Sequence, residues 1–194
     1  MEQVIPVCKI IFKIPPTAGF VVLAKSTNLI RMKENKIEIS YKVFDDINEL
    51  TKEDAWLLNE ARDVTKQAYA PYSNFYVGAA AKLVNGEIVA GTNQENASFP
   101  VGLCAERVLL ASASTLYPGV AIETMAISYQ SGNGNSNQPI APCGMCRQSL
   151  QEYEIRVKKP IRLILGGFEG KIFVFEKASQ LLPLGFSSDD LSRV

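Results

Sequence analysis

The sequence predicts an α/β fold of three layers, in which helices cover both faces of a mixed, mostly five-stranded central sheet. The chain has 194 residues, 47% of them hydrophobic, which is enough to bury the core of one ordinary domain. After a first helix, the expected elements follow the order β-β-α-β-α-β-β, which is typical of a mixed sheet. Two helix-then-strand units require right-handed crossovers, so we expect parallel strands in the middle of the sheet.

The first helix is expected over residues 51–70. Thr51 and Asp54 have the spacing of a capping box, which satisfies the free N–H groups at the start of a helix. Four apolar residues then follow at helical spacing, as expected for a face turned to the core: Leu57, Ala61, Val64 and Ala68.

The next segments predict a β-hairpin. Residues 75–84 and 87–93 flank Asn85-Gly86, a dipeptide suited to a two-residue turn in which both residues have positive φ. The remaining expected elements are helices over 104–116 and 143–153 and strands over 122–129, 161–165 and 171–175. Residues 131–139 read SGNGNSNQP and predict a polar loop.

Composition excludes several classes of function. The chain has 20 basic and 20 acidic residues, so it lacks the net positive charge that sequence-independent binding to nucleic acid requires. It contains no histidine, which excludes Ser-His-Asp hydrolysis, Cys-His proteolysis and histidine metal centres. Carboxylate, thiolate, lysine and tyrosine chemistry remain.

Residues 1–31 differ in character from the rest of the chain, and we expect residues 32–194 to form a single catalytic domain. The apolar stretch from Val4 to Ala24 is broken by lysines and by Pro15-Pro16, so it is too short for a membrane span. It also lacks the basic start of a signal peptide. We interpret residues 1–31 as an extension, or as translation upstream of a true start at Met32.

Four cysteines are too few for a disulfide-stapled protein, so the sequence favours a reducing compartment and a cytoplasmic location. Three of them lie at the starts of two expected helices: Cys104, Cys143 and Cys146. Residues at i and i+3 share one face of a helix, so Cys143 and Cys146 can reach one ion. Helix N-termini also stabilise thiolates. We therefore predict a Zn²⁺ site, and three protein ligands leave the fourth tetrahedral position open, as in catalytic zinc sites.

Three charged residues adjoin the predicted ligands. Glu106 comes two residues after Cys104, where its carboxylate can act as a proton shuttle without ligating the ion. Arg107 follows Glu106 directly, and Arg147 follows Cys146 directly. We expect both arginines to donate hydrogen bonds to the sulfurs. The alternatives for Cys-x-x-Cys are a closed structural zinc site and a thioredoxin-like redox pair.

The sequence resembles the cytidine deaminases of the small, homotetrameric, all-cysteine zinc type. Cys-x-Glu followed by Pro-Cys-x-x-Cys is a variant of the zinc deaminase signature, with Cys104 in the place of histidine. The similarity extends from about residue 68 to residue 191. It rests on five ordered blocks at 69–80, 91–98, 104–107, 142–148 and 181–186.

The resemblance implies a role for each matching residue. Cys104, Cys143 and Cys146 would hold one Zn²⁺ per subunit, and Glu106 would be the catalytic acid and base. Asn93 and Glu95 would bind the ribose hydroxyls, and an amide and a carboxylate at i and i+2 on an extended segment do point the same way. Three further positions would contact the substrate, the last from a neighbouring subunit: Phe75, Ala105 and Phe186.

The implied reaction is the zinc-dependent hydrolytic deamination of cytidine and deoxycytidine to uridine and deoxyuridine, with release of ammonia. The substrate would be a free nucleoside. The protein would form a homotetramer and would bind neither nucleic acid nor membrane. Two alternatives stay open: a deaminase of another cytosine-bearing substrate, such as blasticidin S, and a non-catalytic module in which zinc is structural. Phe99 departs from the family pattern, because many relatives carry tyrosine there.

A chain that begins at Met32 is expected to fold and to keep the activity of the full-length chain, because the expected core and site all lie beyond residue 31. Thermal unfolding and an ammonia-release assay of both chains check this. Failure to fold, or loss of all activity, contradicts the assignment of residues 1–31 as an extension.

Overall fold

The computed structural model describes residues 33–192, so the predictions for residues 1–31 and for Cys8 lie outside the described residues. The chain forms two compact units with a boundary between Lys36 and Ile37. All the helices and strands of the described residues belong to the unit that begins at Ile37. The strands are β1 (Lys42–Phe44), β2 (Phe75–Leu83), β3 (Ile88–Thr92), β4 (Ile122–Ser131), β5 (Arg162–Gly166) and β6 (Ile172–Phe175). The α-helices are α1 (Lys52–Val64), α2 (Ala105–Leu116), α3 (Gly144–Val157) and α4 (Ser188–Leu191).

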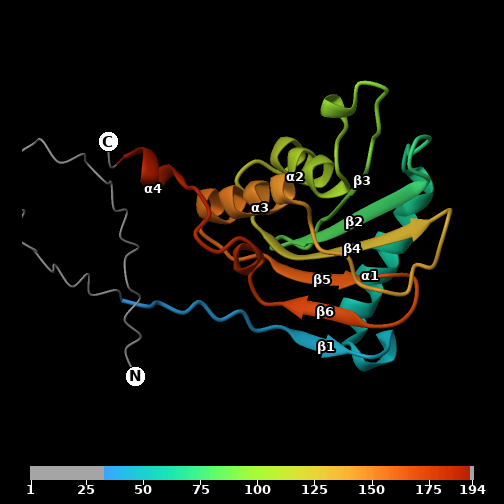
Figure 1. Ribbon diagram of the computed structural model, residues 1–194, viewed down its shortest axis with the longest axis horizontal. Helices are drawn as coiled ribbons and strands as arrows, with labels where there is room; N and C mark the ends of the chain where they lie inside the picture. Colours follow the sequence, from blue (N-terminus) through green and yellow to red (C-terminus); the bar gives the residue numbers. More distant parts are fainter. Residues whose placement is uncertain (1–32, 193–194) are drawn as a thin grey trace, which may run out of the picture. The chain divides into compact units, whose positions relative to one another are not determined.

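One six-stranded sheet, in the order β1-β6-β5-β4-β2-β3, forms the middle layer of the unit (Figure 1). Helix α1 covers one face, and α2 and α3 cover the other. The expected parallel pairing occurs between β4 and β5, and the other neighbouring strands are antiparallel. The mixed three-layer α/β fold is therefore confirmed.

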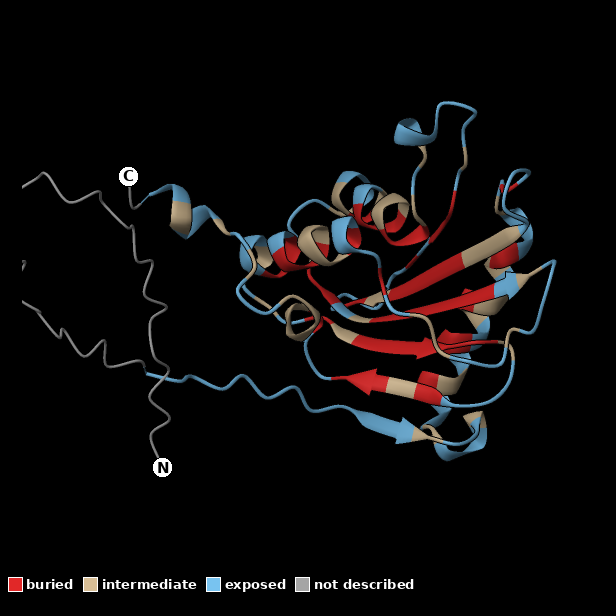
Figure 2. Cartoon of the chain, viewed as in Figure 1, coloured by how far each residue is buried: buried red, intermediate tan, exposed pale blue. Residues whose placement is uncertain are grey.

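The two faces of the sheet are assigned by residue alternation, because successive side chains of a strand point to opposite sides. Buried residues packed with α2 and α3 include Ala79, Ala81, Met125, Ile127, Leu163 and Leu165. Their neighbours in sequence pack with α1 instead: Ala80, Ala126 and Ile164. Burial on both faces explains why the central strands read as continuous apolar runs and are coloured as buried in Figure 2.

The sheet has six strands where the sequence predicted mostly five. The additional strand is β1, a three-residue edge strand that pairs antiparallel with β6. A segment this short and half-exposed has no periodicity to detect. Tertiary contacts hold it in place, including the Tyr41 ring stacked on Phe175 at 4.9 Å and the Lys42–Glu176 ion pair at 2.7 Å.

Helix α1 begins as predicted but ends earlier, at Val64 rather than residue 70. Thr51 caps it, because the Asp54 N–H donates to Thr51 Oγ1 at 3.1 Å. The Asp54 carboxylate accepts two hydrogen bonds from Arg162 on β5, at 2.5 and 2.9 Å. At the other end the helix tightens into a 3₁₀ turn, Thr65–Gln67, where Thr65 Oγ1 donates to the Arg62 carbonyl.

The hairpin between β2 and β3 is present, but the prediction of a two-residue turn is wrong. Leu83 and Glu87 close a three-residue loop, with a Leu83 N–H to Glu87 O hydrogen bond of 2.8 Å. Gly86 has φ of 89°, whereas Asn85 stays at negative φ and its side chain accepts from the Glu87 N–H at 3.2 Å. A type I turn followed by one left-handed glycine needs only one residue at positive φ.

Helices α2 and α3 each begin one residue later than predicted, so Cys104 and Cys143 occupy the N-cap positions. Strand β3 lies very close to the start of α2. A Cβ atom on Gly91 would lie 2.6 Å from the Ala105 carbonyl oxygen and 2.5 Å from the Leu109 nitrogen. Only glycine permits this approach, which sets the position of Cys104 relative to the end of β3.

The substitution Gly91→Ala is expected to lower the free energy of unfolding by about 1–3 kcal/mol, the usual cost of overpacking a core. The new methyl group would contact helix backbone, which cannot move as a side chain can. Urea unfolding measures the change. Gly134→Ala is the matched control, because its Cβ would meet nothing closer than Ser131 Oγ at 3.7 Å; equal stability of the two variants contradicts the prediction.

Candidate active site

The three predicted cysteine ligands lie together at the starts of α2 and α3. The Sγ atoms of Cys143 and Cys146 are 3.4 Å apart, and those of Cys104 and Cys143 are 3.7 Å apart. All three sulfurs lie within 4.8 Å of one another. Two sulfurs bound to one tetrahedral zinc at about 2.3 Å are separated by about 3.8 Å, so this donor set fits the ion.

The chemistry of the three thiols also favours a cation. The hydrogen bond with Cys146 lowers the pKa of Cys104 to about 6, and the same contact raises the pKa of Cys146. The pair therefore favours one thiolate and disfavours a second, because the thiol that donates the hydrogen bond must remain protonated. A doubly charged ion removes this restriction, since metal binding displaces the protons. The arrangement suits three thiolates around Zn²⁺.

Glu106 lies on the first turn of α2 beside the sulfurs. Its side chain is only 5% exposed, and burial raises the pKa of its carboxyl group. A hydrogen bond with Cys146 and the positive charge of Arg107 act in the opposite direction. A buried carboxyl group of raised pKa, next to a metal-binding cluster, has the properties of a general acid and base.

The two arginines occupy different environments. Arg107 is half-buried, and its positive charge favours the ionised forms of Cys104 and Glu106, although burial has the larger effect at Glu106 and its pKa stays raised. The Arg147 guanidinium donates from Nε to the Pro142 carbonyl at 2.8 Å and from Nη1 to the Leu181 carbonyl at 3.0 Å. These bonds connect α3 to the backbone on either side of it, and the sulfur contact of Arg147 stays a prediction.

Asn93 follows β3 and is buried, and its side chain crosslinks β3 to β2. Its Oδ1 accepts from the Val77 N–H at 2.7 Å, and its Nδ2 donates to the Phe75 carbonyl at 2.8 Å. An amide oxygen accepts two hydrogen bonds and an amide NH₂ donates two, so each group keeps one position for a ligand. The two backbone bonds hold the amide in a single orientation.

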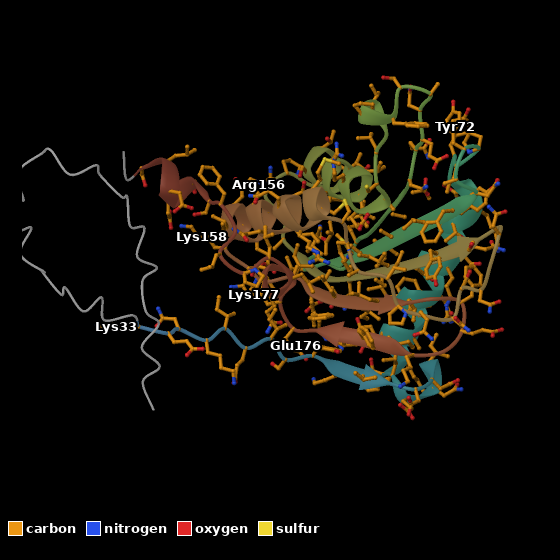
Figure 3. All side chains as sticks on the ribbon, viewed as in Figure 1. Lys33, Tyr72, Arg156, Lys158, Glu176 and Lys177 are labelled. Atoms are coloured by element: carbon orange, nitrogen blue, oxygen red, sulfur yellow. The ribbon has the colours of Figure 1, made fainter. Side chains whose placement is uncertain are left out.

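Glu95 is held from the loop before β2. Its Oε2 accepts from the backbone N–H groups of Tyr72 at 2.9 Å and Ser73 at 3.3 Å, and Tyr72 is labelled in Figure 3. Hydrogen bonds from the Ser73 side chain and from both backbone groups lower the pKa of Glu95, because they stabilise the ionised carboxylate. The structure therefore orients both polar side chains predicted to bind ribose.

Three predicted contact residues and Phe99 differ in exposure. Phe75 is half-buried and stacks on Tyr129 at 4.8 Å, while Ala105 is fully buried at the start of α2. Phe186 lies beyond α3 and is 57% exposed. Phe99 is 74% exposed and meets Tyr72 edge to face at 5.8 Å.

The sequence reasoning missed residues that support the site. Tyr129, which stacks on Phe75, lies at the end of the strand predicted over 122–129, and no role in the site was predicted for it. The side chains of Gln148, Gln151 and Glu154 on α3 bind the backbone of the C-terminal segment. Gln151 and Glu154 are buried polar residues of α3, and the structure shows that they are buried because they bind the backbone of other segments.

The fold and site define a zinc-binding α/β protein with a three-cysteine centre and an acidic side chain beside it. Residues 51–159 match the family described as the cytidine and deoxycytidylate deaminase zinc-binding region. The chain belongs to this family, which confirms the resemblance stated above.

Individual relatives agree. The chain is 35% identical to a cytidine deaminase of Halalkalibacterium halodurans over 136 residues, which cover 70% of this chain and 96% of the relative. It is 34% identical to one of Mycobacterium tuberculosis over 140 residues, covering 71% and 92%. The crystal structure of cytidine deaminase from Burkholderia pseudomallei superimposes with a TM-score of 0.60 at 37% identity, covering 71% of this chain and all of that one.

The purified chain is expected to bind one zinc ion, and Cys104→Ala or Cys143→Ala should abolish most of this binding, because each removes one of three ligands. Elemental analysis after dialysis measures the metal content. Cys8→Ala is the control and should keep the full zinc content. A loss of zinc in that variant instead shows a fourth sulfur ligand, which contradicts an open catalytic site.

Proposed function

We propose that the chain is a zinc-dependent cytidine deaminase, which converts cytidine and deoxycytidine with water to uridine and deoxyuridine and releases ammonia. The proposal rests mainly on one observation: the Glu106 carboxyl group is buried beside three sulfurs that are spaced for one zinc ion. Family membership and relatives named cytidine deaminase support the choice of substrate. The reaction suits pyrimidine salvage.

Glu106 carries the protons in the proposed mechanism. Zinc, when held by Cys104, Cys143 and Cys146, supplies Lewis acidity that makes water a nucleophile near neutral pH. Glu106 accepts a proton from the attacking water and delivers it to N3 of the pyrimidine, while the water oxygen adds to C4. Glu106 then accepts the proton of the new C4 hydroxyl group and delivers it to the amino group, so that the C4–N bond breaks, ammonia leaves and the C4 carbonyl of the product forms. Its raised pKa suits a carboxyl group that must both accept and donate.

The remaining predicted residues would position the nucleoside. Asn93 and Glu95 would bind the ribose hydroxyls, and their backbone hydrogen bonds support this role because they leave little orientational freedom to lose on binding. Phe75, held by its stack on Tyr129, would pack against the pyrimidine, beside Ala105. Phe186 would cover the base.

We also propose a cytoplasmic homotetramer that shares its active sites between subunits and binds neither nucleic acid nor membrane. Exposed apolar side chains support an assembly, because Phe99 and Val101 are exposed on one 3₁₀ turn and Leu184 is 93% exposed, and protein interfaces bury such side chains. The cysteines of the described residues are free thiols, which suits a reducing compartment. Among residues 33–192, no helix is both long and apolar enough to cross a membrane. Residues 32–194 would form the catalytic domain.

The substitution Glu106→Gln should reduce kcat at least about 100-fold, because it removes proton transfer but keeps the shape of the side chain. Zinc content should be unchanged, since the three sulfurs remain. Ammonia release from cytidine and elemental analysis measure the two effects. Glu152→Gln, an exposed position on α3, is the control; unchanged turnover in Glu106→Gln overturns its assignment as the proton shuttle.

A substrate panel separates the proposal from its alternatives. We expect turnover of cytidine and deoxycytidine, and none of a cytosine-containing oligonucleotide or of blasticidin S. The ribose-binding pair and the zero net charge are the reasons. Preferential turnover of blasticidin S contradicts the nucleoside assignment. A zinc-loaded chain inactive on the whole panel indicates a structural zinc module.

A further inference from the structure

Helix α3 holds the C-terminal segment of the chain through polar side chains. Arg147 donates to the Leu181 carbonyl, and the buried Glu154 carboxylate accepts from the N–H groups of Ala178 at 3.0 Å and Ser179 at 3.2 Å. These contacts fasten the 3₁₀ helix Ala178–Leu181 along α3. From there the chain continues past α3 to α4 (Figure 1).

Side chains of α3 also bind the backbone beyond the 3₁₀ helix, at Phe186. Its carbonyl oxygen accepts from Gln148 Nε2 at 2.8 Å and from Gln151 Nε2 at 3.2 Å. Gln148 and Gln151 are three positions apart, so both project from one face of α3. A single carbonyl therefore has both of its acceptor positions filled by side chains of the same helix.

The backbone around Phe186 is constrained on both sides as well. Leu184 has φ of 57°, a left-handed conformation that a leucine rarely adopts. At Gly185, a Cβ atom would lie 2.3 Å from Gln151 Oε1, so the Gln151 side chain packs closely against this backbone. Ser187 forms a capping box with Asp190, with an Ser187 N–H to Asp190 Oδ2 distance of 2.9 Å.

The Phe186 ring does not benefit from these constraints within its own chain. It is 57% exposed, and Leu184 is 93% exposed, so neither apolar side chain adds much to the core. Backbone strain that gains no burial points to a functional requirement. The constraints fix the place and direction of the ring rather than its packing.

We infer that Gln148 and Gln151 are positioning residues of the deamination reaction, which hold the main chain at Phe186 so that its exposed ring meets the base of the substrate in one orientation. This inference rests on the proposed function. Because Phe186 would contact the substrate of a neighbouring subunit, the two glutamines would fix the ring on the surface that this chain presents to that subunit. Preorganisation of this kind is expected to strengthen substrate binding rather than to alter proton transfer.

The test measures kcat and KM for cytidine in the double variant Gln148→Met/Gln151→Met, which keeps side-chain length but removes both donors. One neutral hydrogen bond is worth roughly a factor of two to ten. We expect KM to rise about fivefold or more, with kcat within about twofold of wild type and zinc content unchanged. Hydrogen exchange of residues 182–187 should accelerate.

A cycle with Phe186→Ala distinguishes positioning from general stabilisation. If the glutamines act through the ring, the double variant should raise KM no further in the Phe186→Ala background. An equal rise in both backgrounds overturns the inference, as does an unchanged KM in the double variant. The single variant Gln148→Met keeps the test valid if the double variant does not fold, because Gln148 is the less buried of the two.

Gln67→Met is the matched control, an identical substitution at an exposed position of the 3₁₀ helix Thr65–Gln67. It should leave both kinetic constants unchanged. If the wild-type chain itself fails to deaminate cytidine, the proposed function falls and this inference falls with it. If the wild-type chain is active and the glutamine substitutions raise KM equally with and without Phe186→Ala, only the inference is wrong.

Discussion

The convergence of two helix N-termini on one point is the constraint on which the site depends. Cys104 and Cys143 are the N-cap residues of α2 and α3, and Cys146 lies on the first turn of α3. Three sulfurs come within bonding range of one ion only if both helices begin at the same place. The sheet ensures this, because α2 and α3 pack on the same face and each connects two of its strands. Glu106 is buried for the same reason.

The close approach of β3 to α2 transmits this constraint to the proposed substrate groups. Gly91 brings strand and helix backbones into contact, and Asn93 and Glu95 follow within four residues. Hydrogen bonds from Asn93 to β2 and to Glu95 from the loop before β2 then fix both side chains. The three cysteines, Asn93 and Glu95 are therefore held by one connected set of backbone contacts. Because the polar side chains are oriented before the substrate binds, substrate binding loses less entropy.

Predictions from the sequence succeeded where local periodicity or capping determines structure, and failed where tertiary contacts do. All five predicted strands are present, and the central ones, β2, β4 and β5, are largely buried apolar runs. Strand β1 was missed because its three residues are held by pairing with β6 and by the Tyr41 stack. The extent of α1 was overestimated because Thr65 binds the Arg62 carbonyl and tightens the last turn. The turn at Asn85-Gly86 uses the asparagine side chain as an acceptor, which a dipeptide preference does not reveal.

The sequence by itself determined the chemistry of this protein: three thiols, a carboxyl group two residues after the first thiol, and no histidine to act in their place. Such features depend on residue identity and on spacing within one helical turn, both of which are local. Only the tertiary structure decided that Cys104 meets a pair of cysteines about 40 positions away. It also decided that Gln148 and Gln151 hold a turn that carries Phe186. These contacts join segments whose proximity follows from the packing of helices on the sheet, and no local pattern encodes that packing.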